Sequence, residues 1–130
     1  MLDIYAGEES ILVTDDEPLV LSLTTKILRK HGYKVYVARN GEEALLLHVS
    51  EQVDLVLTDV IMPHMTGPEL VHELKRKKPD LRCLYMSGYD PGYIRNSAGE
   101  HVGCDYLLKP FTAEALLKKI RHTLDAGKEP

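Results

Sequence analysis

Three acids and one lysine directly follow apolar, strand-like runs in this 130-residue chain. They are Asp15 and Asp16 after Ile11–Thr14, Asp59 after Val53–Thr58, and Lys109 after Tyr106–Leu108. If the runs are buried strands, these side chains project from the strand tips. Carboxylates packed together repel one another unless a cation intervenes, and Mg²⁺ prefers carboxylate and phosphate oxygens. The pattern therefore indicates a site for a divalent cation and a phosphoryl group.

The same residues also allow interpretations that involve no phosphoryl site. The acids Asp15 and Asp16 could form a solvated loop before a helix N-terminus, where negative charge is favoured anyway. Lys109 can hold a phosphoryl oxygen or can simply pair with an aspartate. Ser87 ends another apolar run and precedes Gly88. Its hydroxyl could donate to a phosphoryl oxygen, although Ser-Gly alone is an ordinary turn signal.

The elements that must position these residues alternate between strands and helices. The predicted strands are Ser10–Thr14, Lys34–Ala38, Val53–Thr58, Leu81–Met86 and Asp105–Leu108. Runs rich in Val, Leu and Ile with little alternation favour strands covered on both faces, as in a parallel sheet. Five β-α repeats predict an α/β, doubly wound parallel sheet with right-handed crossovers. Ligands of such sheets bind beyond the carboxyl ends of the strands.

Local signals predict where the helices begin. Pro18 suits a first helical position, and the helix that follows should stop at Gly32. Capping residues precede three more segments, namely Asn40 with Glu43, Thr66 with Glu69, and Thr112. The segment Pro91–His101 shows little apolar periodicity, so we expect a short or irregular helix there.

Composition narrows the class of protein. Apolar residues make up 44% of the chain and the net charge is −4, which fits one folded domain and disfavours direct nucleic-acid binding. Residues 10–125 form the expected domain, with 1–9 a loose lead-in and 126–130 a tail. No apolar run reaches a membrane span and no signal peptide begins the chain, so we expect a cytoplasmic protein without membrane insertion. Cys83 and Cys104 match no metal or redox spacing and are expected to be buried free thiols.

Four blocks of the chain resemble the response-regulator receiver (CheY-like) domains of two-component phosphorelay systems. They are ILVTDDEP at Ile11–Pro18, LTDVIMP at Leu57–Pro63, MSG at Met86–Gly88 and LKPF at Leu108–Phe111. The resemblance runs from about Ser10 to Leu124. It implies a flavodoxin-like (βα)5 fold with strand order 2-1-3-4-5. The lead-in and the loops after Asp59 and Ser87 are similar to receivers of hybrid sensor histidine kinases.

The resemblance also implies roles for individual residues. Asp59 would accept a phosphoryl group from a histidine kinase or a histidine phosphotransfer domain. Asp16, Asp59 and the backbone carbonyl of Ile61 would bind Mg²⁺, or Mn²⁺ in its place, with Asp15 acting largely through water. Ser87 and Lys109 would hold the phosphoryl oxygens, and the Lys109–Pro110 bond is expected to be cis.

Ser87 and Tyr106 would form the switch. It would change the surface made by residues 91–101, the strand Asp105–Leu108 and the last helix. Such a domain is a signalling module rather than an enzyme, although it assists its own phosphorylation and dephosphorylation. We expect a monomer, or a weak dimer that forms on phosphorylation. The chain leaves no room for an output domain after Leu124, so a stand-alone receiver and one excised from a larger protein both remain open.

Two bulky side chains should affect how long the phosphoryl group stays. Ile61 lies two residues after Asp59, and Tyr89 lies two residues after Ser87. In such domains these positions flank the path of the hydrolytic water, and neither side chain is suited to orient it. The sequence therefore predicts slow self-dephosphorylation.

Three other functions compete with this interpretation. A haloacid-dehalogenase-type phosphatase would need a second acid two residues after its nucleophile, where this chain has Ile61. A flavin carrier of the same fold would need a hydroxyl-rich phosphate loop in place of Asp15-Asp16-Glu17. A receiver-like scaffold that is never phosphorylated would not need all five site residues.

Overall fold

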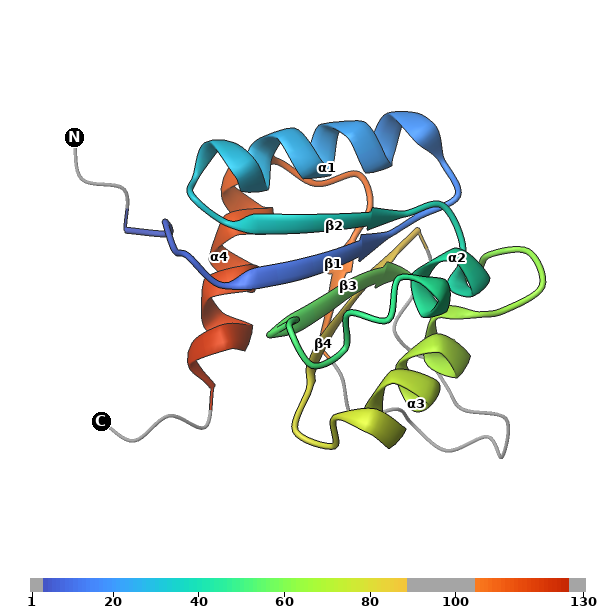
Figure 1. The fold of residues 1–130 in the computed structure, drawn as a ribbon. Helices are drawn as coiled ribbons and strands as arrows, with labels where there is room; N and C mark the ends of the chain where they lie inside the picture. The colour runs from blue at the N-terminus through green and yellow to red at the C-terminus, as the bar shows by residue number, and fades with distance from the viewer. Residues whose placement is uncertain (1–3, 89–104, 127–130) are drawn as a thin grey trace.

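The computed structural model describes residues 4–88 and 105–126, which form a five-stranded parallel sheet in the order β2-β1-β3-β4-β5 (Figure 1). The strands are β1 (Ser10–Thr14), β2 (Lys34–Ala38), β3 (Leu55–Asp59), β4 (Arg82–Ser87) and β5 (Asp105–Leu108). The helices are α1 (Pro18–Lys30), α2 (Gly41–Leu46), α3 (Gly67–Lys77) and α4 (Ala113–Asp125). The predicted doubly wound fold and its strand order are confirmed.

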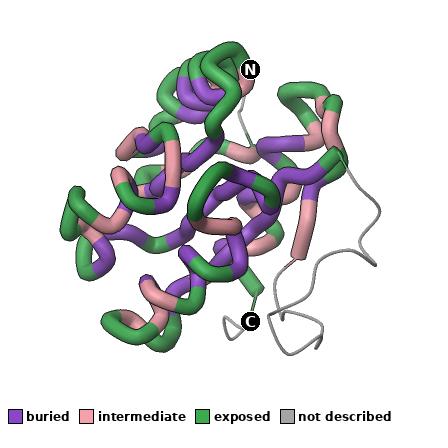
Figure 2. The backbone as a smooth tube through the Cα atoms, turned by 90° about the vertical axis from the view of Figure 1, so that its right-hand side faces the viewer, coloured by how far each residue is buried: buried purple, intermediate pink, exposed green. Residues whose placement is uncertain are grey.

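Helices cover both faces of the sheet (Figure 1), and a layer of buried apolar side chains lies on each face. Alternate residues of each central strand enter opposite layers, so that in β1 Ile11 and Val13 pack on one side and Leu12 on the other. The first layer includes buried side chains of α1 and α4, and the second includes those of α2 and α3. Burial on both faces explains why β3 is buried at every position, and Figure 2 shows these buried segments at the centre of the molecule.

Two strands begin and end later than predicted. The sequence suggested Val53–Thr58 and Leu81–Met86, whereas the strands are Leu55–Asp59 and Arg82–Ser87. The amide groups of Val53 and Leu81 donate to carbonyls of preceding turns, at Val49 and Lys78, so neither residue joins a strand. At the other ends, Asp59 pairs with Met86 and Ser87 pairs with Leu108, so Asp59 and Ser87 are themselves the last residues of their strands.

The helix caps hold the carboxyl edge of the sheet in place. Thr66 and Glu69 form the full capping box predicted for α3, each side chain accepting from the other residue's backbone N–H. At α2, Asn40 caps as predicted by accepting from the Glu43 N–H at 2.8 Å. The side chain of Glu43 does not complete a box, because it accepts from the Arg39 N–H instead.

The prediction of free thiols is wrong for Cys83, which is disulfide-bonded. Leu84, the residue after Cys83, pairs with Asp105 across β4 and β5. The only other cysteine of the sequence, Cys104, directly precedes Asp105 and lies outside the described residues. Sequence spacing could not show the pairing of Leu84 with Asp105, because it depends on strand register.

Three further points concern membrane-spanning helices, the lead-in and residues 91–101. Among the described residues, no helix combines the length and the apolar character needed to cross a membrane. Arg121 of α4 holds the lead-in through Glu9, with Nη2 to Oε2 at 2.6 Å, and also contacts the hydroxyl of Tyr33. The irregular helix expected at residues 91–101 lies outside the described residues.

Candidate functional site

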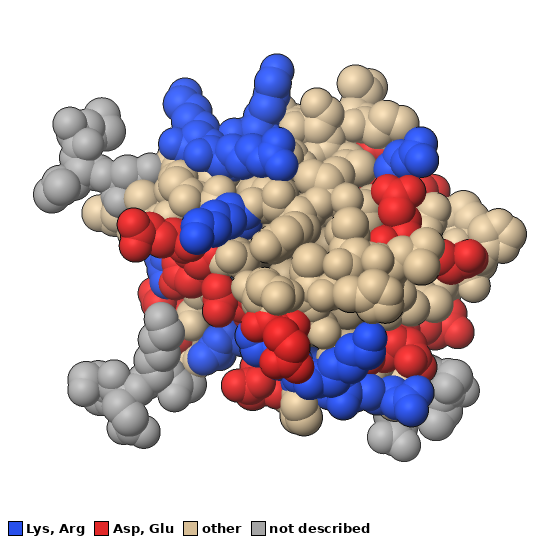
Figure 3. Space-filling view, in the orientation of Figure 1, with Lys and Arg blue, Asp and Glu red and all other residues tan. Residues whose placement is uncertain are grey.

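The carboxyl ends of four neighbouring strands bring the predicted charged residues together. Asp15 directly follows β1, Asp59 ends β3, Ser87 ends β4 and Lys109 directly follows β5. The order β1-β3-β4-β5 sets these ends side by side. The Lys109 N–H donates to the Ser87 carbonyl at 2.7 Å, which fixes the lysine against the end of β4. Acidic side chains line the edge to which the strand arrows of Figure 1 point (Figure 3).

Both aspartates at the centre of the site are buried. Asp15 has no exposed surface and Asp59 is 8% exposed. Asp15 Oδ1 accepts from the Glu17 N–H at 2.9 Å, and Asp59 Oδ1 accepts from the Val60 N–H at 2.9 Å. One oxygen of each carboxylate is therefore oriented by the backbone.

The ammonium of Lys109 lies among three carboxylates. Its Nζ is 2.9 Å from Asp15 Oδ2, 3.0 Å from Glu17 Oε1 and 3.5 Å from Asp59 Oδ1. The Lys109 side chain is 14% exposed, so these contacts are shielded from solvent on most sides. The peptide bond between Lys109 and Pro110 is cis, as expected from the resemblance.

Burial perturbs the titration of the central groups. Burial raises the pKa of Asp59 to about 6; Lys109 opposes this rise and the charge of Asp15 adds to it. Burial acts to lower the pKa of Lys109, but the Asp15 and Glu17 carboxylates outweigh it, so that this pKa is raised. The site thus holds more negative charge than one lysine neutralises, which favours a second cation.

The donor set fits a hard divalent cation. One carboxylate oxygen from each of Asp15, Glu17 and Asp59 can be chosen so that all three lie within 4.8 Å of one another. Oxygen donors of this kind suit Mg²⁺ or Mn²⁺. Asp16, a predicted direct ligand, is exposed and is not one of these three.

Glu17 is the site residue that sequence reasoning missed. It occupies the N-cap position of α1, but its side chain makes no capping hydrogen bond and turns to Lys109 instead. Its place in an unbroken run of three acids was the available signal. Sequence alone could not show that the third acid, 92 positions before Lys109, reaches the same ammonium.

The remaining predicted residues surround this centre. Ser87 is 1% exposed at the end of β4, and Tyr106 is half-buried in β5. Ile61 is 55% exposed just beyond Asp59. Tyr89 lies outside the described residues.

Gly67 packs directly against the backbone of the central aspartate. Its N–H donates to the Val60 carbonyl at 2.8 Å, and a Cβ at this position would collide with the Asp59 carbonyl oxygen. The first turn of α3 therefore presses on the end of β3, which helps to fix the position of the Asp59 carboxylate.

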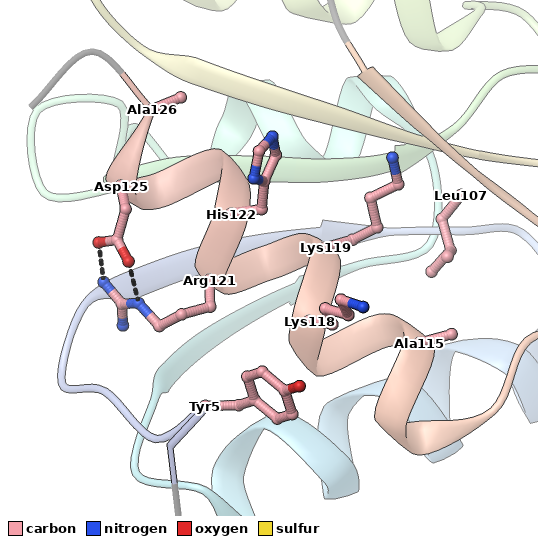
Figure 4. Close-up of a pocket in the computed structure, with 9 residues that line it drawn as sticks. All are labelled: Tyr5, Leu107, Ala115, Lys118, Lys119, Arg121, His122, Asp125 and Ala126. Atoms are coloured by element: carbon pink, nitrogen blue, oxygen red, sulfur yellow. Dashed lines mark hydrogen bonds and ion pairs between the residues drawn. The ribbon is translucent and has the colours of Figure 1, made fainter.

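A cavity of about 750 Å³ lies elsewhere, beside α4 (Figure 4). Its walls include Tyr5, Leu107 and His122, and none of the site acids lines it. In Figure 4 the Arg121 guanidinium is paired with Asp125 rather than free for a ligand. The acid cluster, not this cavity, is the place suited to phosphoryl chemistry.

Residues 11–121 match the family model of the response regulator receiver domain. The chain belongs to this family. Among curated proteins, this receiver domain is 32% identical to the sensor kinase CckA of Brucella abortus over 92% of its own length and 13% of that protein. It is 30% identical to the probable transcriptional regulatory protein TcrX of Mycobacterium tuberculosis over 88% of its own length and 49% of the regulator. The receiver domain thus spans about half or less of these relatives.

Solved structures agree with the family assignment. The receiver domain of the hybrid histidine kinase CckA superposes with a TM-score of 0.75 at 31% identity, covering 88% of this chain and 98% of that one. The response regulator TrrA of Thermotoga maritima, solved in complex with Mg²⁺ and BeF, gives a TM-score of 0.74 at 33% identity, with 88% and 98% covered. As a receiver domain, the chain is a module of two-component signalling whose family binds Mg²⁺ at an acidic pocket.

Proposed function

We propose that Asp59 accepts a phosphoryl group from the phosphohistidine of a histidine kinase or a histidine phosphotransfer domain. The single observation that carries this proposal is the buried Asp59 carboxylate, 3.5 Å from Lys109 and grouped with two further acids. Lys109 is in place to hold a phosphoryl oxygen, and Ser87 ends the adjacent strand. This arrangement supplies positioning and charge compensation, which is most of what phosphoryl transfer requires from a protein.

We assign different tasks to the two oxygens of Asp59. Oδ1 accepts from the Val60 N–H and faces Lys109, so we assign the attack on phosphorus to Oδ2. The bond between phosphorus and the donor imidazole nitrogen breaks as the bond to Oδ2 forms, and the imidazole takes up a proton. The Lys109 ammonium would then pair with the negatively charged phosphoryl oxygens.

The metal-binding residues we propose are Asp15, Asp16, Asp59 and the backbone carbonyl of Ile61. When bound, Mg²⁺ supplies positive charge that offsets the repulsion between the carboxylate and the phosphoryl group. Mn²⁺ offers the same hard-cation chemistry and is proposed as a substitute.

The switch we propose couples Ser87 to Tyr106. Tyr106 pairs with Tyr85 in the sheet, and Ser87 pairs with Leu108, so Ser87 and Tyr106 both lie where β4 contacts β5. Movement of the Ser87 hydroxyl toward a phosphoryl oxygen would change the packing between these two strands and the neighbouring surface on β5 and α4. The module acts by this change rather than as an enzyme, and as a monomer or a weak phosphorylation-dependent dimer.

The proposed place of action is the cytoplasm, without direct binding to nucleic acid. The net charge of −4 supports the second point, because nucleic-acid binding relies on a concentrated basic surface. The Cys83 disulfide would be reduced in a reducing compartment.

The test is intact mass after incubation with Mg²⁺ and phosphoramidate. We expect the wild-type chain to gain the mass of one phosphoryl group, and an Asp59→Ala variant to gain none. Chelation of Mg²⁺ should abolish the gain. Equal labelling of the Asp59→Ala variant, or no labelling of the wild type, would reject the assignment.

A further inference from the structure

Glu17 differs from the two aspartates that share Lys109 with it. Its side chain is 61% exposed, whereas that of Asp15 is fully buried and that of Asp59 is 12% exposed. It nevertheless approaches the ammonium to 3.0 Å, closer than Asp59 does. Of the three carboxylates, Glu17 is therefore the one that can leave Lys109 for solvent at little cost in desolvation.

The contact between Glu17 and Lys109 is not part of helix capping. The side chain of this N-cap residue accepts no hydrogen bond from the first turn of α1. Its backbone N–H, by contrast, donates to Asp15 Oδ1 and so fixes the residue at the site entrance. The Glu17 carboxylate therefore contacts Lys109 and does not cap its own helix.

A phosphoryl group arriving at Asp59 needs the same ammonium. Two anions held by one ammonium, each about 2.8 Å from the nitrogen, lie about 4 to 5 Å apart and repel each other. Asp15 cannot withdraw into solvent because it is fully buried. Glu17 is the carboxylate that must give way.

We propose that Glu17 is a positioning residue that holds Lys109 over the site before phosphorylation and competes with the incoming phosphoryl group for its ammonium. This inference rests on the proposed function. Glu17 thereby weakens the binding of any phosphodonor and sets a threshold for loading of Asp59. The covalent step itself is unchanged: the phosphorus–nitrogen bond of the donor breaks, the bond to Asp59 Oδ2 forms, and the leaving nitrogen takes up a proton.

The test compares four purified proteins at saturating Mg²⁺: wild type, Glu17→Gln, Glu17→Asp and Glu51→Gln. Initial rates of phosphoprotein formation are measured by intact mass as the phosphoramidate concentration is varied. Glu51 is a matched control, because it is exposed and lies before β3, at the opposite edge of the sheet. A thermal melt of each protein checks the fold.

Glu17→Gln is expected to lower the half-saturating phosphoramidate concentration about fivefold, the effect of one unit charge across about 4 Å of water-like solvent. The maximal rate should change little, because no group that touches phosphorus is altered. Glu17→Asp should fall between the wild type and Glu17→Gln, because the shorter side chain keeps the negative charge but holds it farther from Lys109. Glu51→Gln should match the wild type.

Three results would overturn the inference alone while Asp59 is still labelled. One is equal half-saturation in Glu17→Gln and Glu51→Gln. Another is wild-type behaviour of Glu17→Asp, which would mean that only charge near α1 matters. The third is a raised Mg²⁺ requirement in Glu17→Gln with unchanged phosphodonor binding, as for a metal ligand. Absence of any phosphoryl mass on wild-type protein would instead overturn the proposed function and, with it, this inference.

Discussion

Replacing Asp59 by Asn should stabilise the metal-free protein, by an amount that depends on pH. Burial raises the pKa of Asp59 from 3.8 to about 6, against the pull of Lys109. The difference, about 6 minus 3.8, corresponds to about 3 kcal/mol at about 1.36 kcal/mol for each pKa unit. The side chain is 12% exposed, so screening by solvent reduces this figure only in part. Asparagine keeps the shape of the side chain but does not ionise.

The sign of the effect follows from proton binding. Because its pKa is higher in the folded protein than in the unfolded chain, Asp59 binds its proton more tightly when folded. Its contribution to the free energy of unfolding is therefore most favourable below about pH 4 and declines as the pH rises to about 6. Above pH 6 the wild type carries the full penalty, whereas Asp59→Asn carries none.

The assay is urea denaturation in the presence of a chelator, at pH values from 4 to 8. Asp59→Asn should be as stable as the wild type near pH 4 and up to about 3 kcal/mol more stable above pH 6.5. Asp80→Asn is the matched control, because Asp80 is an exposed acid between α3 and β4, at the other edge of the sheet. Adding Mg²⁺ should stabilise the wild type more than Asp59→Asn, because ligand binding favours the folded state.

Two outcomes would refute this reasoning. If Asp59→Asn and Asp80→Asn were equally stable at pH 7.5, the buried charge would carry no cost. If the advantage of Asp59→Asn persisted unchanged at pH 4, it would come from packing and not from ionisation.

The other predictions concern four separate features. Ile61→Asn should release phosphate faster than wild type in a phosphate-release assay, because an amide can orient the hydrolytic water; equal or slower release contradicts this. Lys109→Met should abolish labelling by phosphoramidate and, by leaving buried carboxylates uncompensated, should cost about 3 to 5 kcal/mol in urea denaturation without metal. An unchanged unfolding midpoint would argue against that cost. Thr66→Ala should cost about 1 kcal/mol in the same assay through loss of its helix cap; no loss would mean that the capping box contributes nothing. In air-oxidised protein under denaturing conditions, Cys83 should take up an alkylating reagent only after reduction, and labelling before reduction, seen by peptide mass, would disprove its disulfide.

Periodicity and caps were enough to predict a doubly wound α/β sheet, whereas the strand order was predicted from the family resemblance. The apolar run before Asp15 and the stripe ending at Leu124 fix which faces are buried, and Pro18, Thr66 and Thr112 mark helix starts that the structure confirms. These signals are local, because they depend on residues within one or two turns of each other. The convergence of Asp15, Asp59 and Lys109 then follows from parallel strand order.

What the sequence could not supply depends on distances between segments. β3 and β4 start later than predicted because the amides of Val53 and Leu81 donate to turn carbonyls and not to the sheet. Glu17 joined the site through side-chain reach to Lys109, and the bond of Cys83 depends on strand register. Apart from the run of three acids that includes Glu17, none of these features leaves a pattern of residue types in the chain.

The contact of Gly67 with the backbone of Asp59 has a consequence for how this sequence can vary. A library of variants selected for phosphorylation should lose nearly every substitution at position 67, although this residue has no side chain to offer to the chemistry. Even alanine would push its Cβ into the Asp59 carbonyl oxygen and displace the strand end that presents the carboxylate. Positions such as Ile61, exposed at the entrance, should instead accept many side chains and tune the lifetime of the signal.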